Sequence, residues 1–398
     1  MMKKLALTTA LGALVAGAGY AQGIDVKLGV LNDRSGVYAD LSGEGSVVAA
    51  RMAVEDFKAA DKGLNVEIIS ADHQNKPDIG SSIANRWYDE EGVNAILDVP
   101  TSSVALAVAD ITAEKNGVLI DSGAGSTQLT REQCRPTTIH WTYDTAALAN
   151  GTGAAMTNAG GKKWFFLTAD YAFGHSLEEN TVKVVEANGG EVVGTVDVPF
   201  PANDFSSFLL QAQGSGADVI GLANAGGDTV NAIKQASEFG ITQAGQKLAA
   251  LLFFVTDVHA LGAETAQGLS LTEAFYWDQN DATRAWSKRF MDTHGAQPTM
   301  VQAGVYSGTM AYLAAVEAVG NTDGKAVAAQ MKSMDIDDPL FGKVNVRGDG
   351  RAVHDMYLFE VKTPDESTGE WDLYNQISSI SGEDAFLPML DECDFTKQ

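Results

Sequence analysis

Several polar residues that could bind a ligand lie in short loops that follow apolar runs of the chain. In its first part these loops span residues 32–40, 100–103 and 122–126. A loop that leads into a helix presents backbone N–H groups, and such groups can bind a carboxylate. The hydroxyl groups of Ser102 and Ser103 would add to such a site, although both side chains can equally serve as helix caps. Gly123 and Gly125 either form turns or let a ligand approach the backbone closely.

Aromatic residues are the candidate ligand contacts in the later part of the chain. Tyr171 lies in the loop 170–174, where an aromatic side chain can close over a ligand. A similar glycine-rich loop spans residues 224–228 and contains Gly226. Tyr276 stands in an aromatic Phe-Tyr-Trp run, which either contacts the ligand or packs between domains.

The sequence motifs of common enzymes are absent. There is no HExxH zinc motif, no GxSxG nucleophile elbow, no GxxxxGK[ST] loop and no GxGxxG loop. The histidines are scattered, at positions 73, 140, 175, 259, 294 and 354. We therefore expect no catalytic residue, no metal site and no cofactor. Catalytic carboxylates need no local signature, so an exported hydrolase with acidic residues in a cleft remains an alternative.

The charge of the chain excludes two classes of partner. Asp and Glu number 52 against 27 Lys and Arg, which gives a formal net charge of −25. Because 45% of the residues are hydrophobic, this acidity belongs to a folded protein rather than to a disordered one. A surface so negative repels phosphate groups, so we expect no nucleic-acid partner and no electrostatic docking on a membrane.

The elements that must position these loops alternate between strand and helix. Short apolar runs rich in Val and Ile indicate buried strands, and longer stretches with apolar residues along one side indicate helices. In the first half the expected strands are 26–31, 66–70, 95–99 and 118–121, and the expected helices are 42–60, 77–91 and 102–116. This order predicts a parallel, doubly wound sheet with the polar loops at its carboxyl edge.

The same alternation restarts after residue 141. The expected strands are 163–167, 191–196, 217–221 and 248–255, and the expected helices are 173–187, 204–215 and 227–239. Further on, the pattern predicts helices over 283–293 and 302–319 and a hairpin of 356–361 with 371–376. The fold class is therefore α/β, with two doubly wound lobes and a ligand cleft between them.

The chain is expected to pass between the lobes three times, near residues 142–144, 272–274 and 348–350. Lobe 1 then comprises residues 24–142 and 275–349, and lobe 2 comprises 145–273 and 351–378. The tail 379–398 is expected to return to lobe 1.

The first 21 residues have the pattern of a secretory signal peptide. Lys3 and Lys4 precede an apolar run, and small residues stand at the end of the segment, where a signal peptidase cleaves. The apolar run is shorter than the roughly 20 residues of a membrane-spanning helix. Export to an oxidising compartment lets Cys134 and Cys393 pair, so we expect a disulfide between them; two separately buried thiols are the alternative.

Several segments, in this order, resemble the periplasmic solute-binding proteins of ABC transporters for branched-chain amino acids. They are the signal peptide, the strand 26–30 followed by Ser35-Gly36, the serine loop 101–103, the segment 122–130 and Tyr171 followed by Gly174. The resemblance covers nearly the whole mature chain. It implies a type I periplasmic binding protein, in which two α/β lobes joined by three hinge segments close on one small ligand.

The resemblance also implies where the ligand binds. In that family the serine loop and the following glycine loop receive the ligand carboxylate, which places Ser102 with Gly123, Ala124 and Gly125. The aromatic lid of the family matches Tyr171. Tyr38, Ser103, Gly226, Phe254 and Tyr276 complete the set of expected ligand contacts.

One position departs from the family. Members that bind α-amino acids carry an acidic residue in the second lobe for the ligand ammonium, and here the matching segment 251–255 is apolar. Asp257 or Asp228 could take that role. If neither does, a ligand without an amino group, such as an aromatic or aliphatic carboxylate or an amide, fits about as well as leucine, because an unpaired buried cation is costly.

The sequence thus favours a monomeric, non-enzymatic receptor in the periplasm that delivers a small ligand to ABC permease subunits. A sensor subunit of a signalling receptor is a third possibility, beside the hydrolase.

Overall fold

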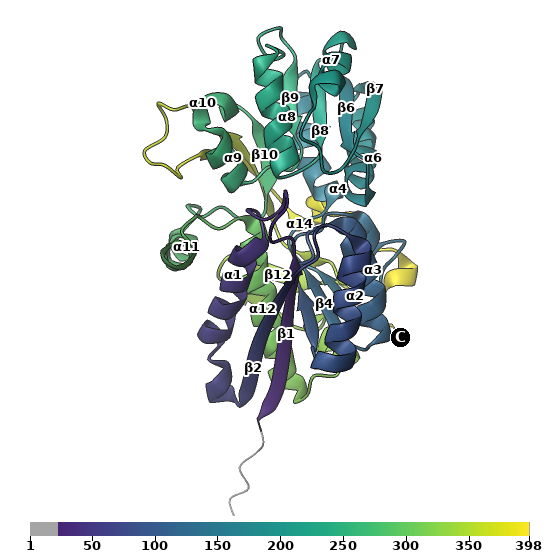
Figure 1. Cartoon of the computed structure of the whole chain (residues 1–398), viewed down its shortest axis with the longest axis vertical. Helices are drawn as coiled ribbons and strands as arrows, with labels where there is room; N and C mark the ends of the chain where they lie inside the picture. The colour runs from purple at the N-terminus through teal and green to yellow at the C-terminus, as the bar shows by residue number, and fades with distance from the viewer. Residues whose placement is uncertain (1–22, 398) are drawn as a thin grey trace, which may run out of the picture.

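Two parallel sheets form two lobes that are stacked along the long axis of the molecule (Figure 1). The structure is a computed structural model, and it describes residues 23–397. The predicted signal peptide, residues 1–21, lies outside the described residues. Among the helices of the described part, none combines the length and the apolar character needed to cross a membrane.

Lobe 1 is built on a five-stranded parallel sheet with the strand order β2-β1-β3-β4-β5. The strands are β1 (Ile24–Asn32), β2 (Leu64–Asp72), β3 (Ala95–Leu97), β4 (Val118–Asp121) and β5 (Thr138–His140). Val26, Leu28 and Val30 point to one face of the sheet and Leu31 to the other, and all four are buried. Both faces are therefore covered, which explains why these strands are apolar throughout.

Helices cover both faces of this sheet, with α1 and α12 on one side and α2 and α3 on the other (Figure 1). The helices of lobe 1 are α1 (Gly43–Phe57), α2 (Pro77–Arg86), α3 (Ser102–Glu114), α11 (Asp281–His294), α12 (Met300–Val319) and α13 (Gly324–Met331). Their starts follow local rules. Ser42 caps α1 through its side chain, and α2 begins at Pro77, whose missing N–H costs nothing in the first turn.

Lobe 2 has a four-stranded parallel sheet in the order β7-β6-β8-β9. Its strands are β6 (Lys163–Ala169), β7 (Glu191–Val198), β8 (Val219–Ala223) and β9 (Lys247–Ala250). Its helices are α4 (Thr145–Leu148), α5 (Ala154–Asn158), α6 (Ala172–Ala187), α7 (Ser206–Gly214), α8 (Gly227–Glu238), α9 (Val255–Leu261) and α10 (Ala263–Ala266). Trp164 and Phe166 pack in the cluster that includes Leu177 of α6, whereas Phe165 and Leu167 face the cluster that includes α7 and α8. This alternation is what a strand buried on both faces requires.

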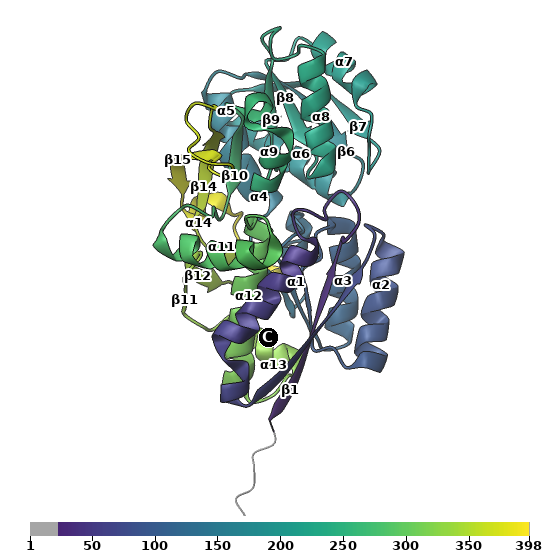
Figure 2. The same cartoon turned by 60° about the vertical axis from the view of Figure 1, so that its left-hand side comes forward.

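Two small antiparallel sheets adjoin the lobes. In lobe 2, β10 (Ser270–Glu273), β14 (Met356–Val361) and β15 (Tyr374–Ile380) form one of them. Beside α12, β11 (Ile336–Asp338), β12 (Gly342–Val346) and β13 (Ala352–Val353) form the other, and Figure 2 shows both near α14 (Gly382–Ala385). The mixed α/β fold with two lobes confirms the fold class expected from the sequence.

Two expected details differ from the structure. The apolar run 248–255 is not one strand, because β9 ends at Ala250 and α9 begins at Val255. The turn 348–350 joins β12 to β13 rather than joining the two lobes, so the chain crosses to lobe 2 only after β13. Gly350 accounts for this turn, since its φ of 86° suits glycine and its N–H donates to the Arg347 carbonyl.

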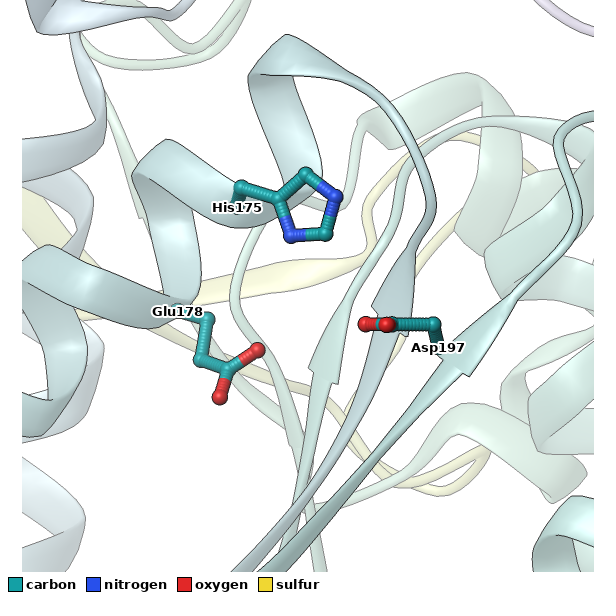
Figure 3. Close-up of side chains that lie close together, drawn as sticks. All are labelled: His175, Glu178 and Asp197. Atoms are coloured by element: carbon teal, nitrogen blue, oxygen red, sulfur yellow. The ribbon is translucent and has the colours of Figure 1, made fainter.

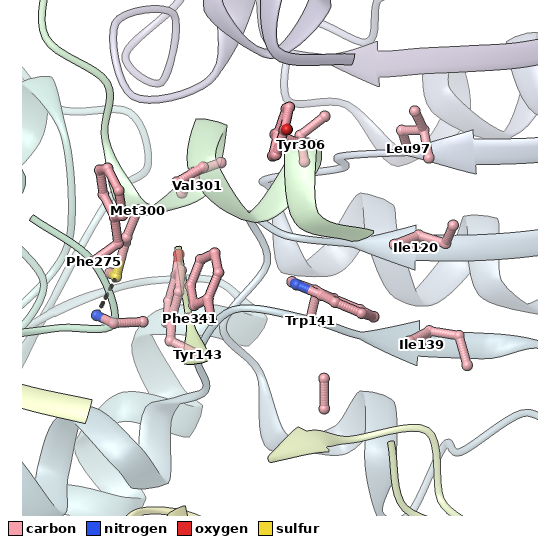
Figure 4. Packing of buried hydrophobic residues seen from close by; sticks show 14 of the residues in the cluster. Leu97, Ile120, Ile139, Trp141, Tyr143, Phe275, Met300, Val301, Tyr306 and Phe341 are labelled. Atoms are coloured by element: carbon pink, nitrogen blue, oxygen red, sulfur yellow. Dashed lines mark hydrogen bonds between the residues drawn. The ribbon is translucent and has the colours of Figure 1, made fainter. Parts of the chain in front are cut away.

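A dense apolar core lies where the crossing segments meet α12. Trp141, Tyr143, Phe275, Met300 and Phe341 are buried there, as Figure 4 shows. The backbone N–H of Ala274, in the second crossing, donates to the sulfur of Met300 at 3.4 Å. The first two crossing segments, near residues 142–144 and 272–274, are therefore packed against lobe 1.

The end of the chain lies against lobe 1. Cys134 and Cys393 form a disulfide across a sequence separation of 259 residues. Arg131 donates to the Pro388 carbonyl, and Arg347 donates to the Leu387 carbonyl. These contacts hold the segment from Leu387 to Cys393 against lobe 1.

Candidate functional site

A small cavity of about 10 Å³ lies between the lobes, at the carboxyl ends of their parallel strands. Open α/β sheets bind ligands at this edge. Lobe 1 and the first crossing contribute loops after β1, β3, β4 and β5, and lobe 2 contributes loops after β6, β8 and β9. The lining residues are Tyr38, Leu41, Pro100, Gly123, Tyr143, Tyr171, Phe173, Ala225 and Leu252.

Aromatic rings from both lobes form much of this cavity. The hydroxyl oxygens of Tyr38 and Tyr171 lie 2.5 Å apart and join the lobes by a hydrogen bond. Phe200 stacks on both rings, with centroid distances of 5.5 Å to Tyr38 and 4.2 Å to Tyr171. Burial raises the pKa of Tyr38 well above its ordinary value and also raises the pKa of Tyr171, so both hydroxyl groups are neutral at neutral pH.

The glycine loop of lobe 1 is held by an internal carboxylate. Asp121 Oδ1 accepts the backbone N–H groups of Gly123 at 3.0 Å and Ala124 at 3.1 Å. Tyr143 donates its hydroxyl to the Gly123 carbonyl at 2.5 Å, and His140 Nε2 lies 2.6 Å from the Ala124 carbonyl oxygen. Four polar contacts thus fix the backbone that the resemblance assigns to a ligand carboxylate.

The serine loop, residues 100–103, also makes a hydrogen bond within lobe 1. The Ser102 hydroxyl accepts the N–H of Ser126 at 3.2 Å, and Ser102 is fully buried. Ser103 is partly exposed, and neither serine lines the cavity. Gly125 is buried beside the cavity, because a Cβ on it would lie 2.8 Å from the Phe173 ring and 3.0 Å from the Tyr143 ring.

Gly226 contacts lobe 1 directly. Its φ of 58° suits glycine, and an added Cβ would lie 2.4 Å from the carbonyl oxygen of Val37. The next residue, Gly227, donates its N–H to the same oxygen at 3.0 Å. These contacts bring the loop after β8 against the loop after β1, so Gly226 lies at the junction of the lobes next to Tyr38.

Phe254, Asp257 and Tyr276, which the sequence analysis also offered as ligand contacts, lie outside the cavity lining as well. Phe254 is fully buried before α9, and its N–H donates to Asp257 at 3.0 Å, so the Asp257 side chain caps that helix. Tyr276 donates its hydroxyl to the Trp371 carbonyl and accepts the Leu373 N–H, which places it in an aromatic cluster of lobe 2.

Three carboxyl groups surround the cavity without lining it. Desolvation by burial raises the pKa of Asp121 and of Asp228 to about 7 and that of Asp98 to about 6. Asp228 accepts the Ala202 N–H with both oxygens at 3.2 Å and acts on both Tyr38 and Tyr171 through its charge. Asp98 lies behind the glycine loop, since a Cβ on Gly123 would lie 2.8 Å from Asp98 Oδ1.

Sequence reasoning missed several of these residues. Tyr143 lies in a predicted crossing, and Phe173 lies in the first turn of α6, shortly after β6. The position of each residue soon after a strand was a usable signal. Asp98 follows β3 and Asp121 ends β4, but nothing in their spacing shows that they lie behind the glycine loop. Phe200 comes to the cavity only through tertiary contacts.

A group of metal-ligand side chains lies apart from this cavity. His175 and Glu178 on α6 face Asp197 on β7, and one donor atom from each lies within 4.8 Å of the others (Figure 3). His175 Nε2 already pairs with Asp170 at 3.0 Å, and Glu178 accepts the Thr168 hydroxyl at 2.5 Å. The group is largely exposed, and two of its three side chains, His175 and Glu178, are engaged by other residues.

Comparison with known proteins identifies the family. Residues 25–369 match the periplasmic binding protein family. A periplasmic binding protein from Burkholderia mallei is 52% identical, with a TM-score of 0.90, covering 94% of this chain and 98% of that chain. A branched chain amino acid ABC transporter periplasmic ligand-binding protein from Burkholderia xenovorans is 39% identical, with a TM-score of 0.81, covering 91% of this chain and 97% of that one.

A relative named for binding branched-chain amino acids also matches this chain. Leu/Ile/Val-binding protein homolog 6 from Brucella melitensis is 28% identical over 382 residues, which are 92% of this chain and 95% of the relative. The resemblance stated from the sequence is confirmed: the chain belongs to the periplasmic binding protein family, with the two-lobed fold of its ABC transporter members.

Proposed function

We propose that this protein is the solute receptor of an ABC importer and that its signal peptide directs its export. The receptor is a monomer that closes its two lobes on one small organic ligand and delivers this ligand to permease subunits. The observation that carries the proposal is the cavity between the lobes. Both lobes line it, and the Tyr38–Tyr171 and Val37–Gly227 hydrogen bonds join them beside it. A ligand that touches both lobes stabilises the closed state over the open one.

The chemistry around the cavity favours binding over catalysis. Its lining consists of aromatic rings, aliphatic side chains and glycine. The nearby carboxyl groups of Asp121 and Asp228 each accept backbone N–H groups, which occupies them in holding loops. A hydrolase would need a carboxylate that reaches the ligand. The family consists of substrate-binding proteins, and relatives named for branched-chain amino acids support a small ligand of similar size.

The test is a ligand screen on the purified mature chain. Thermal unfolding is measured with amino acids, aromatic and aliphatic carboxylates, amides and amines, and ligand turnover is followed by mass spectrometry. We expect one chemical class to raise the unfolding temperature and to be recovered unchanged. Conversion of the ligand would support the hydrolase instead, and stabilisation by none of the compounds would contradict the proposed function.

Closure is measured separately by small-angle X-ray scattering. The radius of gyration is expected to fall when the stabilising ligand is added, because the lobes approach each other. A receptor for a permease and a sensor subunit both close in this way, so the two are separated by transport into cells with and without the gene for this protein.

A further inference from the structure

Three carboxyl groups surround one imidazole on the surface of lobe 2. Glu178 and Asp197 each place a ligand atom within 4.8 Å of a ring nitrogen of His175 and of each other (Figure 3), and Asp170 pairs with the same ring. In the described part of the chain, no Lys or Arg forms an ion pair with any of these three carboxylates. The group is therefore net negative, which favours a cation.

His175 is held in the way that metal-binding histidines are held. Its Nε2 lies 3.0 Å from Asp170 Oδ1. A histidine that binds a metal usually donates its other ring N–H to a carboxylate, which fixes the tautomer and the orientation of the ring. Donation from Nε2 leaves the lone pair of Nδ1 available, and Figure 3 shows one ring nitrogen turned toward the Glu178 carboxylate. The Asp170 contact thus prepares His175 for a metal and does not compete with one.

The two other side chains also have oxygen atoms available. Glu178 accepts the Thr168 hydroxyl with Oε2 at 2.5 Å, and this contact leaves Oε1 for an ion. Asp197, near the end of β7, has no hydrogen-bond or ion-pair partner for its side chain among residues 23–397. One nitrogen and two carboxylate oxygens therefore face the same space.

This ligand set selects a class of metal. One imidazole with two carboxylates suits Zn²⁺ and its first-row neighbours, whereas Ca²⁺ and Mg²⁺ prefer oxygen ligands alone. In a tetrahedral zinc site, ligand atoms at about 2.1 Å from the ion lie about 3.5 Å apart. His175 and Asp197 are exposed and Glu178 is partly exposed, so these side chains can close from 4.8 Å to that separation without disturbing a core.

We propose that His175 Nδ1, Glu178 and Asp197 bind one transition-metal dication of the Zn²⁺ class, with water at the remaining position, and that Asp170 orients His175. This site is separate from the proposed function and does not rest on it. It differs from the expectation of no metal site in the sequence analysis, because Asp197 joins the two residues of α6 only through the fold.

The ion would connect the start of α6 to β7. Tyr171 and Phe173, which line the ligand cavity, lie between Asp170 and His175 in the chain. The backbone of this loop already contacts β7, since the Asp170 N–H donates to the Val198 carbonyl at 2.8 Å. A bound metal would therefore stabilise the loop that carries the lobe 2 side of the cavity.

The test is isothermal titration of the untagged mature chain, first freed of metal, with ZnCl₂ at neutral pH in a buffer that does not bind metals. We expect one Zn²⁺ per chain, and affinities for Ca²⁺ and Mg²⁺ at least about tenfold lower. Zn²⁺ should also raise the unfolding temperature. Absence of stoichiometric Zn²⁺ binding would overturn the proposal, whatever organic ligand the cavity takes.

Variants show where the ion binds. His175→Gln, and separately Glu178→Gln with Asp197→Asn, should each weaken Zn²⁺ binding at least about tenfold. His259→Gln is the matched control, because His259 Nε2 also pairs with a carboxylate, Glu370, at 2.9 Å, but belongs to no group of three ligands in the described part of the chain. It should bind Zn²⁺ as the wild type does. Equal affinity in all variants, or an equal loss in the control, would contradict the site.

Asp170→Asn tests the positioning of His175. Affinity should fall about tenfold, as is usual when the carboxylate behind a ligand histidine is lost. The visible absorption of bound Co²⁺ should stay as in the wild type, because the ligands are unchanged, whereas His175→Gln should alter it. Unchanged affinity, or an altered Co²⁺ spectrum, in Asp170→Asn would contradict the role given to Asp170.

Discussion

Gly226 is the residue on which the contact between the lobes depends most directly. Its backbone carries a positive φ, and its missing Cβ leaves room for the Val37 carbonyl of the other lobe. Any side chain would have to push that carbonyl away, since backbone atoms cannot swing aside as a flexible side chain can. The contacts of Gly226 join the two lobes, and a ligand need not touch this residue.

Gly226→Ala is predicted to weaken ligand binding at least about tenfold, because the added methyl group obstructs closure. Titration with the ligand found in the screen measures this loss. Gly262→Ala is the matched control: Gly262 also has a positive φ of 85°, but no atom lies within 4 Å of its added Cβ. Both variants should lose stability from backbone strain, and only the first should lose affinity. Equal affinities for the two variants would contradict the role of Gly226 in closure.

Asp257 makes the stability of the protein depend on pH. Desolvation by burial raises its pKa to about 7, whereas an Asp in an unfolded chain has a pKa of about 3.9. Between these two values the folded state binds the proton more tightly than the unfolded state does. The contribution of Asp257 to stability is therefore greatest in acid, falls as the pH rises from about 4 to about 7, and is constant above that.

Asp257→Asn is predicted to be more stable than the wild type at about pH 8, by about 1 kcal/mol or more, because the amide keeps the cap to Phe254 and carries no buried charge. The free energy of unfolding in urea, measured for both proteins across this pH range, checks the prediction. The difference should shrink toward pH 4. A difference that is independent of pH would mean that Asp257 does not titrate in this window.

At the scale of elements, the disulfide holds the tail of the chain on lobe 1. Cys134 follows β4, and Cys393 lies near the end of the chain, so one bond closes most of the sequence into a loop. A cross-link over so many residues lowers the entropy of the unfolded chain. It also joins the tail to the lobe that carries the glycine loop of the cavity.

Cys393→Ser is predicted to lower the free energy of unfolding by about 2–5 kcal/mol. Urea unfolding of this variant and of the double variant Cys134→Ser with Cys393→Ser measures the loss, and the two should agree. Ligand affinity at room temperature should stay unchanged, since neither cysteine lines the cavity. A large loss of affinity would show that the tail influences the cavity.

At the scale of the whole molecule, the two lobes are in direct contact beside the cavity. Val37 and Gly227 approach so closely that a Cβ on Gly227 would lie 3.5 Å from the Val37 Cβ. Disulfides have Cβ–Cβ distances of about 3.5–4.5 Å. The two lobes can thus be joined covalently at this contact.

The double variant Val37→Cys with Gly227→Cys is predicted to form a second disulfide and to fix the closed state. Scattering should give one radius of gyration with and without ligand, and ligand added from outside should no longer bind. A reductant should restore binding, and Cys134 and Cys393 do not line the cavity. Each single variant is the control. Free exchange of ligand in the oxidised double variant would contradict closure at this contact.

Local patterns in the sequence were enough to predict two α/β lobes and the loops that meet between them. Buried parallel strands need continuous apolar runs, and helix starts need polar caps. Runs such as 26–31 and the polar loops after them can therefore be predicted from the sequence. The position of Tyr38 and Gly123 at the carboxyl edge of one sheet and of Tyr171 at the carboxyl edge of the other follows from that topology. The boundary at Ala250 was missed because an apolar run does not distinguish a strand from a buried helix start.

Only the tertiary structure decided what each polar group does. Asp121 and the N–H groups of Gly123 and Ala124 are close in sequence, yet their hydrogen bonds depend on how the chain turns after β4. Tyr276 was expected to contact the ligand, but it packs into the core of lobe 2. Phe200 was not expected near the cavity, yet its ring stacks on Tyr38 and Tyr171. Residue types and order determine the elements, whereas hydrogen-bond partners and burial arise from contacts between distant segments, which no local pattern contains.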